Sequence, residues 1–231
     1  GDTRTNAGLD NIATFRKLTV LERPGERVMM LATAGNLSIS QSVMSLLTEG
    51  IESEAGTRRT LMDVESMFEA AGLVGEAIRK VYATYGPALQ QQSMSFDVTF
   101  LIGGQIKGRR LRLFQVYAAG NFIEATQDTP YFQIGEHKYG KPILDRALKY
   151  GTRLEHALRC ALISFDSTIR SNLSVGLPLD VLVYRRDSLQ VPAGYRVEEG
   201  DAYFENVRQQ WCLSLRTLLQ ELPEAPGNYL E

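Results

Sequence analysis

The stretch Val-Met-Met-Leu-Ala-Thr at residues 28–33 is a continuous apolar run, typical of a strand that is buried on both faces of a sheet. It ends at Ala-Gly-Asn, residues 34–36, and the apolar residues that follow have a helical period over residues 39–51. In the other direction, residues 12–21 are rich in β-forming side chains and end at the turn signal Arg-Pro-Gly of residues 23–25. This part of the chain therefore predicts two neighbouring strands followed by a helix.

Helical and strand periodicities continue in groups along the rest of the chain. A long helical pattern over residues 63–85 is expected to end at Gly86-Pro87, because proline disfavours the continuation of a helix. Alternating apolar residues, separated by glycine-containing turn signals, then predict a set of strands. The predicted strands cover residues 94–102, 110–117, 122–126, 131–134 and 179–184, and the remaining predicted helices cover residues 142–150, 153–170 and 202–222.

With residues 122–126 and 131–134 counted together as the last strand of the central set, the order of these elements is β-β-α-α-β-β-β-α-α-β-α. This order excludes a doubly wound parallel sheet, in which single strands alternate with single helices. It favours an α+β fold in which antiparallel sheets lie between helix pairs, a four-layer αββα sandwich. No linker, repeat or low-complexity stretch divides the chain, so residues 1–231 are expected to form a single domain.

The composition excludes several functional classes. Lys and Arg number 25 and Asp and Glu number 27, a net charge of −2, so nucleic-acid binding is not expected. No window approaches roughly 18 consecutive apolar residues and no secretory start is present, so no membrane partner is expected and the cytoplasm is the predicted compartment. Cys160, Cys212, His137 and His156 lack the paired spacings of a zinc site. We therefore expect no metal and no other cofactor, and we expect both cysteines to be buried and reduced.

Five segments, in order along the chain, resemble the active-site segments of proteasome β subunits, which are N-terminal nucleophile hydrolases. Gly-Asp-Thr-Arg-Thr-Asn-Ala-Gly at residues 1–8 resembles their Asp-Ser-Arg-Ala-Thr-x-Gly stretch, and Lys17 lies where they place a catalytic lysine. Thr-Ala-Gly at residues 33–35 resembles their x-Ala-Gly turn. Gln-Ile-Gly at residues 133–135 and Ser-Asn-Leu-Ser-Val-Gly at residues 171–176 resemble their Val-Gly-Ser-Gly and Asp-x-x-Ser-Gly segments.

Within that family, residues 4–17 are similar to the bacterial ancestral β-subunit group, called Anbu. The resemblance implies the four-layer fold and hydrolysis of a peptide bond by an N-terminal threonine. Asp2 resembles the aspartate that orients the lysine, and Lys17 resembles the lysine that lowers the pKa of the nucleophile or carries its proton. Gly35 resembles the glycine whose backbone N–H forms the oxyanion hole, where the lack of a side chain permits a carbonyl oxygen to approach closely.

Further site positions are implied by the same resemblance. Those that resemble the lining of the substrate channel and of the first specificity pocket are Thr5, Asn6 and Thr33. Glu136 and Ser171 stand where proteasome subunits usually have a serine and an aspartate, whereas Ser174 keeps the expected serine. Apart from the resemblance, Glu136 is equally well explained as an acid at a helix N-terminus, and the two serines as caps of backbone groups in a turn.

The beginning of the sequence matches the second strand of this fold rather than the first. The first strand, with the nucleophile at its tip, is expected one hairpin upstream, roughly 12–18 residues before Gly1. The nucleophile is therefore not present in the sequence.

The leading hypothesis is a threonine-type peptidase that cuts unfolded or small peptides inside a ring or spiral of identical subunits. The resemblance implies roughly 12–14 subunits. The long helix predicted over residues 63–85 is a candidate subunit interface, and the sequence does not identify an unfoldase partner. Two other interpretations stay open: an N-terminal nucleophile amidase with one small substrate, and a non-catalytic scaffold subunit. The combination of Asp2, Lys17 and Gly35 argues against a scaffold, since a scaffold has no chemical need for it.

Overall fold

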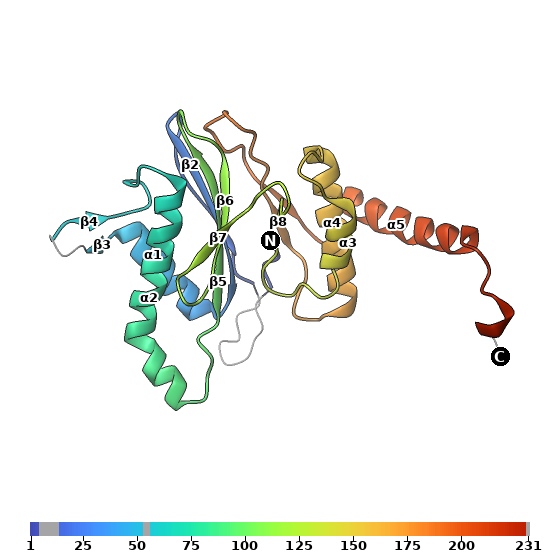
Figure 1. Ribbon diagram of the computed structural model, residues 1–231, viewed down its shortest axis with the longest axis horizontal. Coiled ribbons are helices and arrows are strands. Elements are labelled where there is room, and N and C mark those ends of the chain that lie inside the picture. The colour runs from blue at the N-terminus through green and yellow to red at the C-terminus, as the bar shows by residue number, and fades with distance from the viewer. Residues whose placement is uncertain (5–13, 53–55, 230–231) are drawn as a thin grey trace.

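The computed structural model describes residues 1–4, 14–52 and 56–229. Its main sheet consists of β1 (Leu18–Arg23), β2 (Arg27–Gly35), β5 (Val98–Ile106), β6 (Arg112–Val116) and β7 (Phe122–Glu124). These strands lie in the order β1-β2-β5-β6-β7, and every neighbouring pair is antiparallel (Figure 1). The apolar run of residues 28–33 lies within β2, so the strand predicted there is confirmed. β2 pairs with β5 along its whole length.

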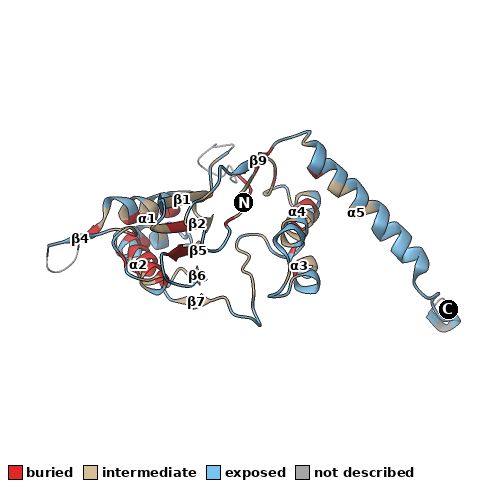
Figure 2. Ribbon diagram, turned by 90° about the horizontal axis from the view of Figure 1, so that it is seen from above, coloured by how far each residue is buried: buried red, intermediate tan, exposed pale blue. Residues whose placement is uncertain are grey.

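Two helices cover one face of this sheet: α1 (Leu37–Glu49) and α2 (Met67–Gln91) (Figure 1). The Asn36 side chain caps α1, because its oxygen accepts hydrogen bonds from the backbone N–H groups of Ser38 and Ile39. The main hydrophobic core lies between these helices and the sheet (red in Figure 2). Its largest fully buried side chains include Met29, Leu31, Ile39, Leu47, Ile78, Phe100, Ile102 and Phe114.

The prediction that Gly86-Pro87 ends the second helix is wrong, because α2 runs through both residues. Proline removes one N–H donor from a helix, and packing on either side of Pro87 offsets that loss. Gly86 is buried against the Tyr82 ring, which lies only 2.7 Å from the place where a Cβ of Gly86 would be. Leu89, beyond the proline, packs against the main core.

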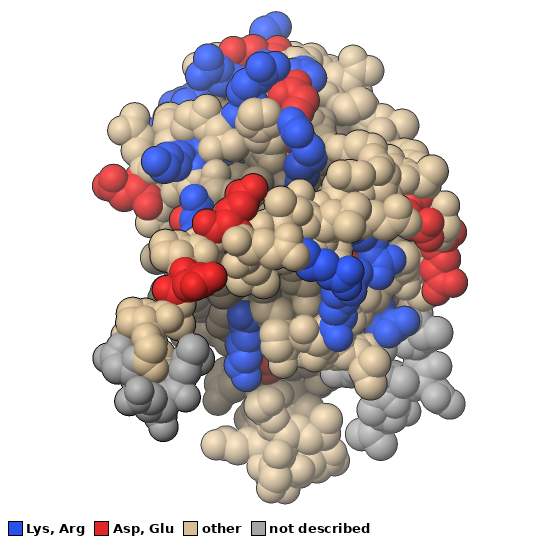
Figure 3. All heavy atoms as spheres, turned by 90° about the vertical axis from the view of Figure 1, so that its right-hand side faces the viewer, with Lys and Arg blue, Asp and Glu red and all other residues tan. Residues whose placement is uncertain are grey.

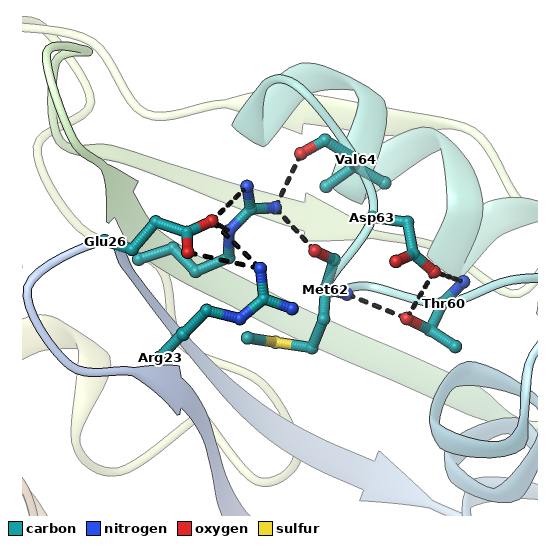
Figure 4. Close-up of polar contacts among 7 residues, drawn as sticks. Arg23, Glu26, Thr60, Met62, Asp63 and Val64 are labelled. Atoms are coloured by element: carbon teal, nitrogen blue, oxygen red, sulfur yellow. Dashed lines mark hydrogen bonds and ion pairs between the residues drawn. The ribbon is translucent and has the colours of Figure 1, made fainter.

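Polar contacts fix the segment that leads into α2 (Figure 4). The guanidinium group of Arg27, at the start of β2, donates hydrogen bonds to the carbonyl oxygens of Met62 and Val64, both at 2.8 Å. Glu26 accepts from Arg27 and from Arg23, so the turn between β1 and β2 belongs to the same network. The segment before α2 is thereby tied to the end of the sheet at which β2 begins.

A smaller part of the chain lies on the other side of the main sheet (Figure 1). Its elements are α3 (Lys141–Ala147), α4 (Leu154–Ser171), β8 (Leu179–Val181) and β9 (Tyr195–Val197). β8 and β9 form an antiparallel pair, and a second core joins them to α4 through Leu162, Leu179, Val197 and Phe204. The chain is thus of the predicted α+β class, with helices packed on antiparallel sheets.

Several short elements differ from the prediction. β3 (Ile51–Glu52), β4 (Arg58–Arg59) and β9 were not predicted, because they do not lie within a longer run of β-forming residues, as the three-residue strands β7 and β8 do. Residues 131–134, predicted as a strand, have no strand conformation. This segment instead lies along the cavity described below.

The last long helix, α5 (Ala202–Glu221), extends away from the rest of the molecule (Figure 1). Its beginning is firmly anchored: Asp201 accepts a hydrogen bond from the Phe204 N–H, and the Phe204 side chain lies in the second core. Nε of Arg208 lies 2.7 Å from Oδ1 of Asp166, a buried residue of α4. Beyond these contacts most of the helix is exposed (pale blue in Figure 2).

Two further observations concern the predicted class of protein. Cys160 on α4 and Cys212 on α5 are free thiols that are only half-buried, so the prediction that both are buried is wrong. No helix in the described part of the chain is both long enough and apolar enough to cross a membrane.

Candidate active site

Lys17 and Asp2 form an ion pair, with Nζ of Lys17 2.8 Å from Oδ1 of Asp2. The same ammonium group donates a hydrogen bond to the carbonyl oxygen of Arg4 at 2.6 Å. The two residues belong to different sheets, because Lys17 directly precedes β1 whereas Asp2 forms a β-bridge with Leu179 of β8. Their side chains are 24% and 12% exposed, so the pair is largely shielded from water and its electrostatic interaction is stronger than it would be on the surface.

Gly35 ends β2 in a conformation that requires glycine. Its φ is +104°, and a Cβ at this position would lie 2.4 Å from the carbonyl oxygen of Asp97. The N–H of Thr33 donates to the carbonyl oxygen of Lys17 at 3.1 Å. Because alternate N–H groups of a strand point to the same side, the N–H of Gly35 points toward the Lys17 side of β2. This direction suits an oxyanion hole.

The ion pair and Gly35 line one cavity of about 680 Å³, a volume typical of sites for small ligands. Its lining includes the apolar side chains of Phe15, Leu101, Phe132 and Phe165. The predicted site residues that line the same cavity are Asp2, Lys17, Thr33, Gly35, Glu136 and Ser174. The fold therefore brings together residues that lie far apart in the sequence.

Asn172, which the sequence did not single out, connects two of these residues. Its Nδ2 donates to Oε2 of Glu136 at 2.8 Å, and its Oδ1 accepts from the hydroxyl of Ser174 at 2.7 Å. Oε1 of Glu136 accepts from the backbone N–H of Lys138 at 2.9 Å. The hydrogen bond from Lys138, followed by that from Asn172, lowers the pKa of the Glu136 carboxyl, so this group is ionised at neutral pH.

Two buried oxygen atoms of the cavity-lining residues have no hydrogen-bond donor among the residues that the structure describes. They are Oδ2 of Asp2 and Oε1 of Gln133. Buried acceptors in folded proteins nearly always have a partner, so both atoms are suited to receive N–H or O–H groups that enter the cavity. In the sequence, Gln133 belongs to the glycine-containing segment of residues 133–135, and no local pattern marks its side chain as a site residue.

The remaining predicted site residues have other outcomes. Ser171 is the last residue of α4, is exposed, and is not among the residues that line the cavity. Thr5 and Asn6 lie outside the described residues, so their places in the substrate channel stay a prediction. Within residues 1–4, 14–52 and 56–229, no group of three or more His, Cys, Asp and Glu side chains could hold a metal ion.

A scan against models of protein families and a search of curated proteins gave no match. Solved structures gave many. One is Anbu (ancestral β-subunit) from Yersinia bercovieri, with 51% identity and a TM-score of 0.88 over 98% of this chain and 92% of that chain. Another is described as the helical assembly of the Anbu complex from Pseudomonas aeruginosa, with 53% identity and a TM-score of 0.90 over 99% and 93%. Anbu from Hyphomicrobium sp. strain MC1 matches with 48% identity and a TM-score of 0.85 over 98% and 93%.

Proposed function

Because the chain belongs to the Anbu family, the ancestral β-subunit homologues of the proteasome, we propose that it is a threonine-type peptidase of the N-terminal nucleophile class. The observation that carries the proposal is the shielded ion pair of Lys17 and Asp2, which shares one cavity with Gly35. A cation held beside a strand-end N–H that points to the same side is what attack by a hydroxyl on a carbonyl carbon requires.

The nucleophile in this proposal is a threonine at the N-terminus of a strand that precedes Gly1. That strand would join the sheet of β8 and β9 and complete a single four-layer domain. The unpartnered Oδ2 of Asp2 and Oε1 of Gln133 support this placement, since a strand and its terminal residue bring N–H and O–H donors.

In the proposed reaction, the threonine hydroxyl attacks the carbonyl carbon of a peptide, and its proton passes to the α-amine of the same threonine. The ammonium group of Lys17 lowers the pKa of that hydroxyl by stabilising the developing alkoxide. Asp2 and the Arg4 carbonyl hold the ammonium group in place, and the N–H of Gly35 donates to the oxyanion of the tetrahedral intermediate.

The intermediate then collapses. The C–N bond breaks and the proton on the α-amine passes to the leaving amine. Water attacks the acyl ester that remains and gives one proton to the α-amine. As the C–Oγ bond breaks, this proton passes to the threonine oxygen, which releases the carboxylic acid and restores the free threonine with its neutral α-amine. Proton balance is thus maintained over the two steps without any metal or cofactor.

The other lining residues position the reactants in this proposal. Glu136 and Ser174, joined through Asn172, hold the α-ammonium form of the threonine, since a carboxylate with a lowered pKa stays ionised beside it. Thr33 borders the pocket for the substrate side chain. Thr5 and Asn6 are proposed for the same pocket from the resemblance alone. Ser171 has no direct role here, because it lies outside the cavity.

We also propose that the chain acts as a homo-oligomer of roughly 12–14 subunits. A helical assembly is described for the relative from Pseudomonas aeruginosa, which supports an open or spiral arrangement. Peptides are the proposed substrate and the cytoplasm is the proposed compartment, which the two free thiols support.

The first experiment determines the N-terminal residue and intact mass of the native, untagged protein before and after treatment with a peptide epoxyketone. This reagent forms bonds with both the hydroxyl and the α-amine of an N-terminal threonine. We expect a threonine start, addition of one reagent per chain, and loss of peptide hydrolysis in the same proportion. A native chain that starts at Gly1, or peptide hydrolysis that persists after complete labelling, would contradict the proposal.

A panel of unfolded proteins and small amides separates the peptidase from the narrow amidase. The peptidase is expected to cut several unfolded proteins. Turnover of a single small amide, with none of the unfolded proteins cut, would favour the amidase.

A further inference from the structure

The exposed part of α5 carries a continuous apolar stripe. Positions spaced three or four residues apart lie on one side of a helix. On α5 one such row consists of Phe204, Arg208, Trp211, Leu215, Leu218 and Leu222, and every member beyond Arg208 is apolar. Leu222 directly follows the last helical residue. The stripe begins against α4 and then leaves the body of the molecule.

Exposure rises along this stripe. Phe204 is buried in the second core and Trp211 is half-buried, but Leu215, Leu218 and Leu222 are 40%, 52% and 54% exposed. Single exposed leucines are ordinary on a protein surface, whereas a row that continues a buried face is not. The side of α5 that packs against the molecule at Phe204 therefore stays apolar toward Leu222. There, the described residues of this chain provide no surface that covers it.

The geometry of α5 aims this stripe away from its own body. The Asp201 cap and the contact of Arg208 with the buried Asp166 fix the direction of the helix at its start. From Trp211 to Leu222 the helix rises about 16 Å. A helical segment of this length is marginal in water without a packed face, so its stability calls for a surface that covers the stripe. Figure 3 looks onto the side from which α5 extends, where residues other than Lys, Arg, Asp and Glu cover much of the surface and charged residues lie among them.

We propose that the stripe of Trp211, Leu215, Leu218 and Leu222 docks on a second copy of this chain, as a subunit contact of the assembly. This inference rests on the homo-oligomer proposed above. An arm that projects from one subunit suits a heterologous contact, in which unlike surfaces meet and the contact repeats from copy to copy. A helical assembly, as described for the relative with 53% identity, is built from contacts of this kind.

The test compares two substitutions on opposite sides of the same helix. Leu218→Glu places a charge in the stripe. Leu213→Glu is the matched control, because Leu213 is 54% exposed and lies on the other side of α5. Mass is measured by light scattering over a dilution series of the full-length native protein, and circular dichroism checks that both variants keep their helix content.

We expect the unaltered protein and Leu213→Glu to form the same large species. Leu218→Glu is expected to raise the protein concentration needed for half-assembly by about tenfold or more, since a charge in an apolar contact is strongly unfavourable. Assembly of Leu218→Glu at the unaltered concentration, or an equal defect in Leu213→Glu, overturns the assignment of the contact to this stripe.

A monomer at every concentration of the unaltered protein overturns the homo-oligomer itself, and this inference with it. Reaction of each variant with the epoxyketone is measured in parallel. A failure of the subunit contact is thereby distinguished from a failure of the proposed active site.

Discussion

The chemistry of the proposed site depends on a lysine that one carboxylate and one carbonyl oxygen hold in place. Nζ of Lys17 lies within 3 Å of Oδ1 of Asp2 and of the Arg4 carbonyl oxygen, at 2.8 and 2.6 Å. Both partners come from the first four residues of the chain, so the position of the ammonium group depends on how this segment packs. The proposed chemistry of Lys17 therefore depends on how the main sheet packs against the sheet of β8 and β9.

Lys17→Ala is expected to reduce peptide hydrolysis by at least about 100-fold, because the group that stabilises the alkoxide is removed. It also leaves the buried carboxylate of Asp2 without its cation, which costs about 1–3 kcal/mol of the free energy of unfolding. Turnover assays and urea unfolding measure these two effects. Lys141→Ala is the control, since Lys141 pairs with Asp145 on the surface and its loss should change both quantities little. Full activity in Lys17→Ala would remove this residue from the mechanism.

Gly35→Ala is expected to destabilise the protein by at least about 2 kcal/mol and to abolish hydrolysis. The new Cβ would collide with the Asp97 carbonyl oxygen and would separate the ends of β2 and β5. Gly25→Ala is the matched control, because Gly25 also has a positive φ, +76°, but no atom lies within 4 Å of its missing Cβ. This control should lose about 1 kcal/mol in thermal unfolding and retain activity. Equal losses of stability and activity in both variants would show that the close contact of Gly35 with the Asp97 carbonyl oxygen is not the cause of the effect.

At the scale of residues, the sequence predicts the site only in part. The resemblance to proteasome β subunits selects Asp2, Lys17 and Gly35, which residue type and spacing alone do not single out, and the structure brings all three to one cavity. Asn172 could not be predicted, because its role depends on a contact with Glu136 across 36 positions of the chain. Gln133 is similar, since only folding shows that its side-chain oxygen is buried without a donor.

Among the elements, β8 and β9 form the least extensive sheet that contributes to the site, and a cross-strand pair holds them together. Asp180 and Arg196 face each other in the register and share two hydrogen bonds of 2.7 and 2.9 Å. The side-chain hydrogen bond from Arg196 lowers the pKa of the Asp180 carboxyl. The folded-state pKa therefore lies below the value of about 3.9 for an unfolded aspartate.

This pKa shift predicts a pH-dependent stability. The stabilisation is fully present above the unfolded pKa and is lost as the pH falls through the lower, folded pKa. Asp180→Asn should lower Tm by about 1–2 °C at pH 6, and its difference from the unaltered protein should shrink as the pH is lowered below 4. Calorimetry over this pH range measures the effect, with Arg196→Gln as the reciprocal variant. A difference that stays constant with pH would show that the pair contributes no charge-dependent stability.

The elements that the sequence predicts well are those with long, unbroken patterns. The apolar run of residues 28–33 and the helical period of α2 reflect burial against many neighbours, which is why both were found. Pro87 misled the prediction, because the cost of a missing N–H is local whereas the packing of Leu89 that offsets it is not. β3, β4 and β9 are short and lie in no longer run of β-forming residues, so they become visible only through their pairing in the folded chain.

Across the whole molecule, stability is divided between two cores of unequal size. The main core combines the five-stranded sheet with α1 and α2, whereas α4 packs on β8 and β9 through a small group of side chains. We expect amide hydrogen exchange to be slowest in α2 and β5 and measurably faster in α4 and β8. Mass spectrometry of fragments measures these rates. Equal protection in both parts would indicate that the two cores unfold as one unit.

Lys17 and Asp2 are held by different sheets, and this has a consequence while the protein is being synthesised. Asp2 owes its place to Leu179 and its neighbour Pro178, whose carbonyl oxygen accepts from the N–H of Thr3, and a ribosome adds these residues late. Lys17 is held by β2, which is translated early. A nascent chain that has folded only its main sheet therefore has the cation without the positioned carboxylate. In the proposed mechanism, hydrolysis would therefore begin only when translation has passed β8, and an unfinished chain would be unable to cut itself or its neighbours on the same messenger.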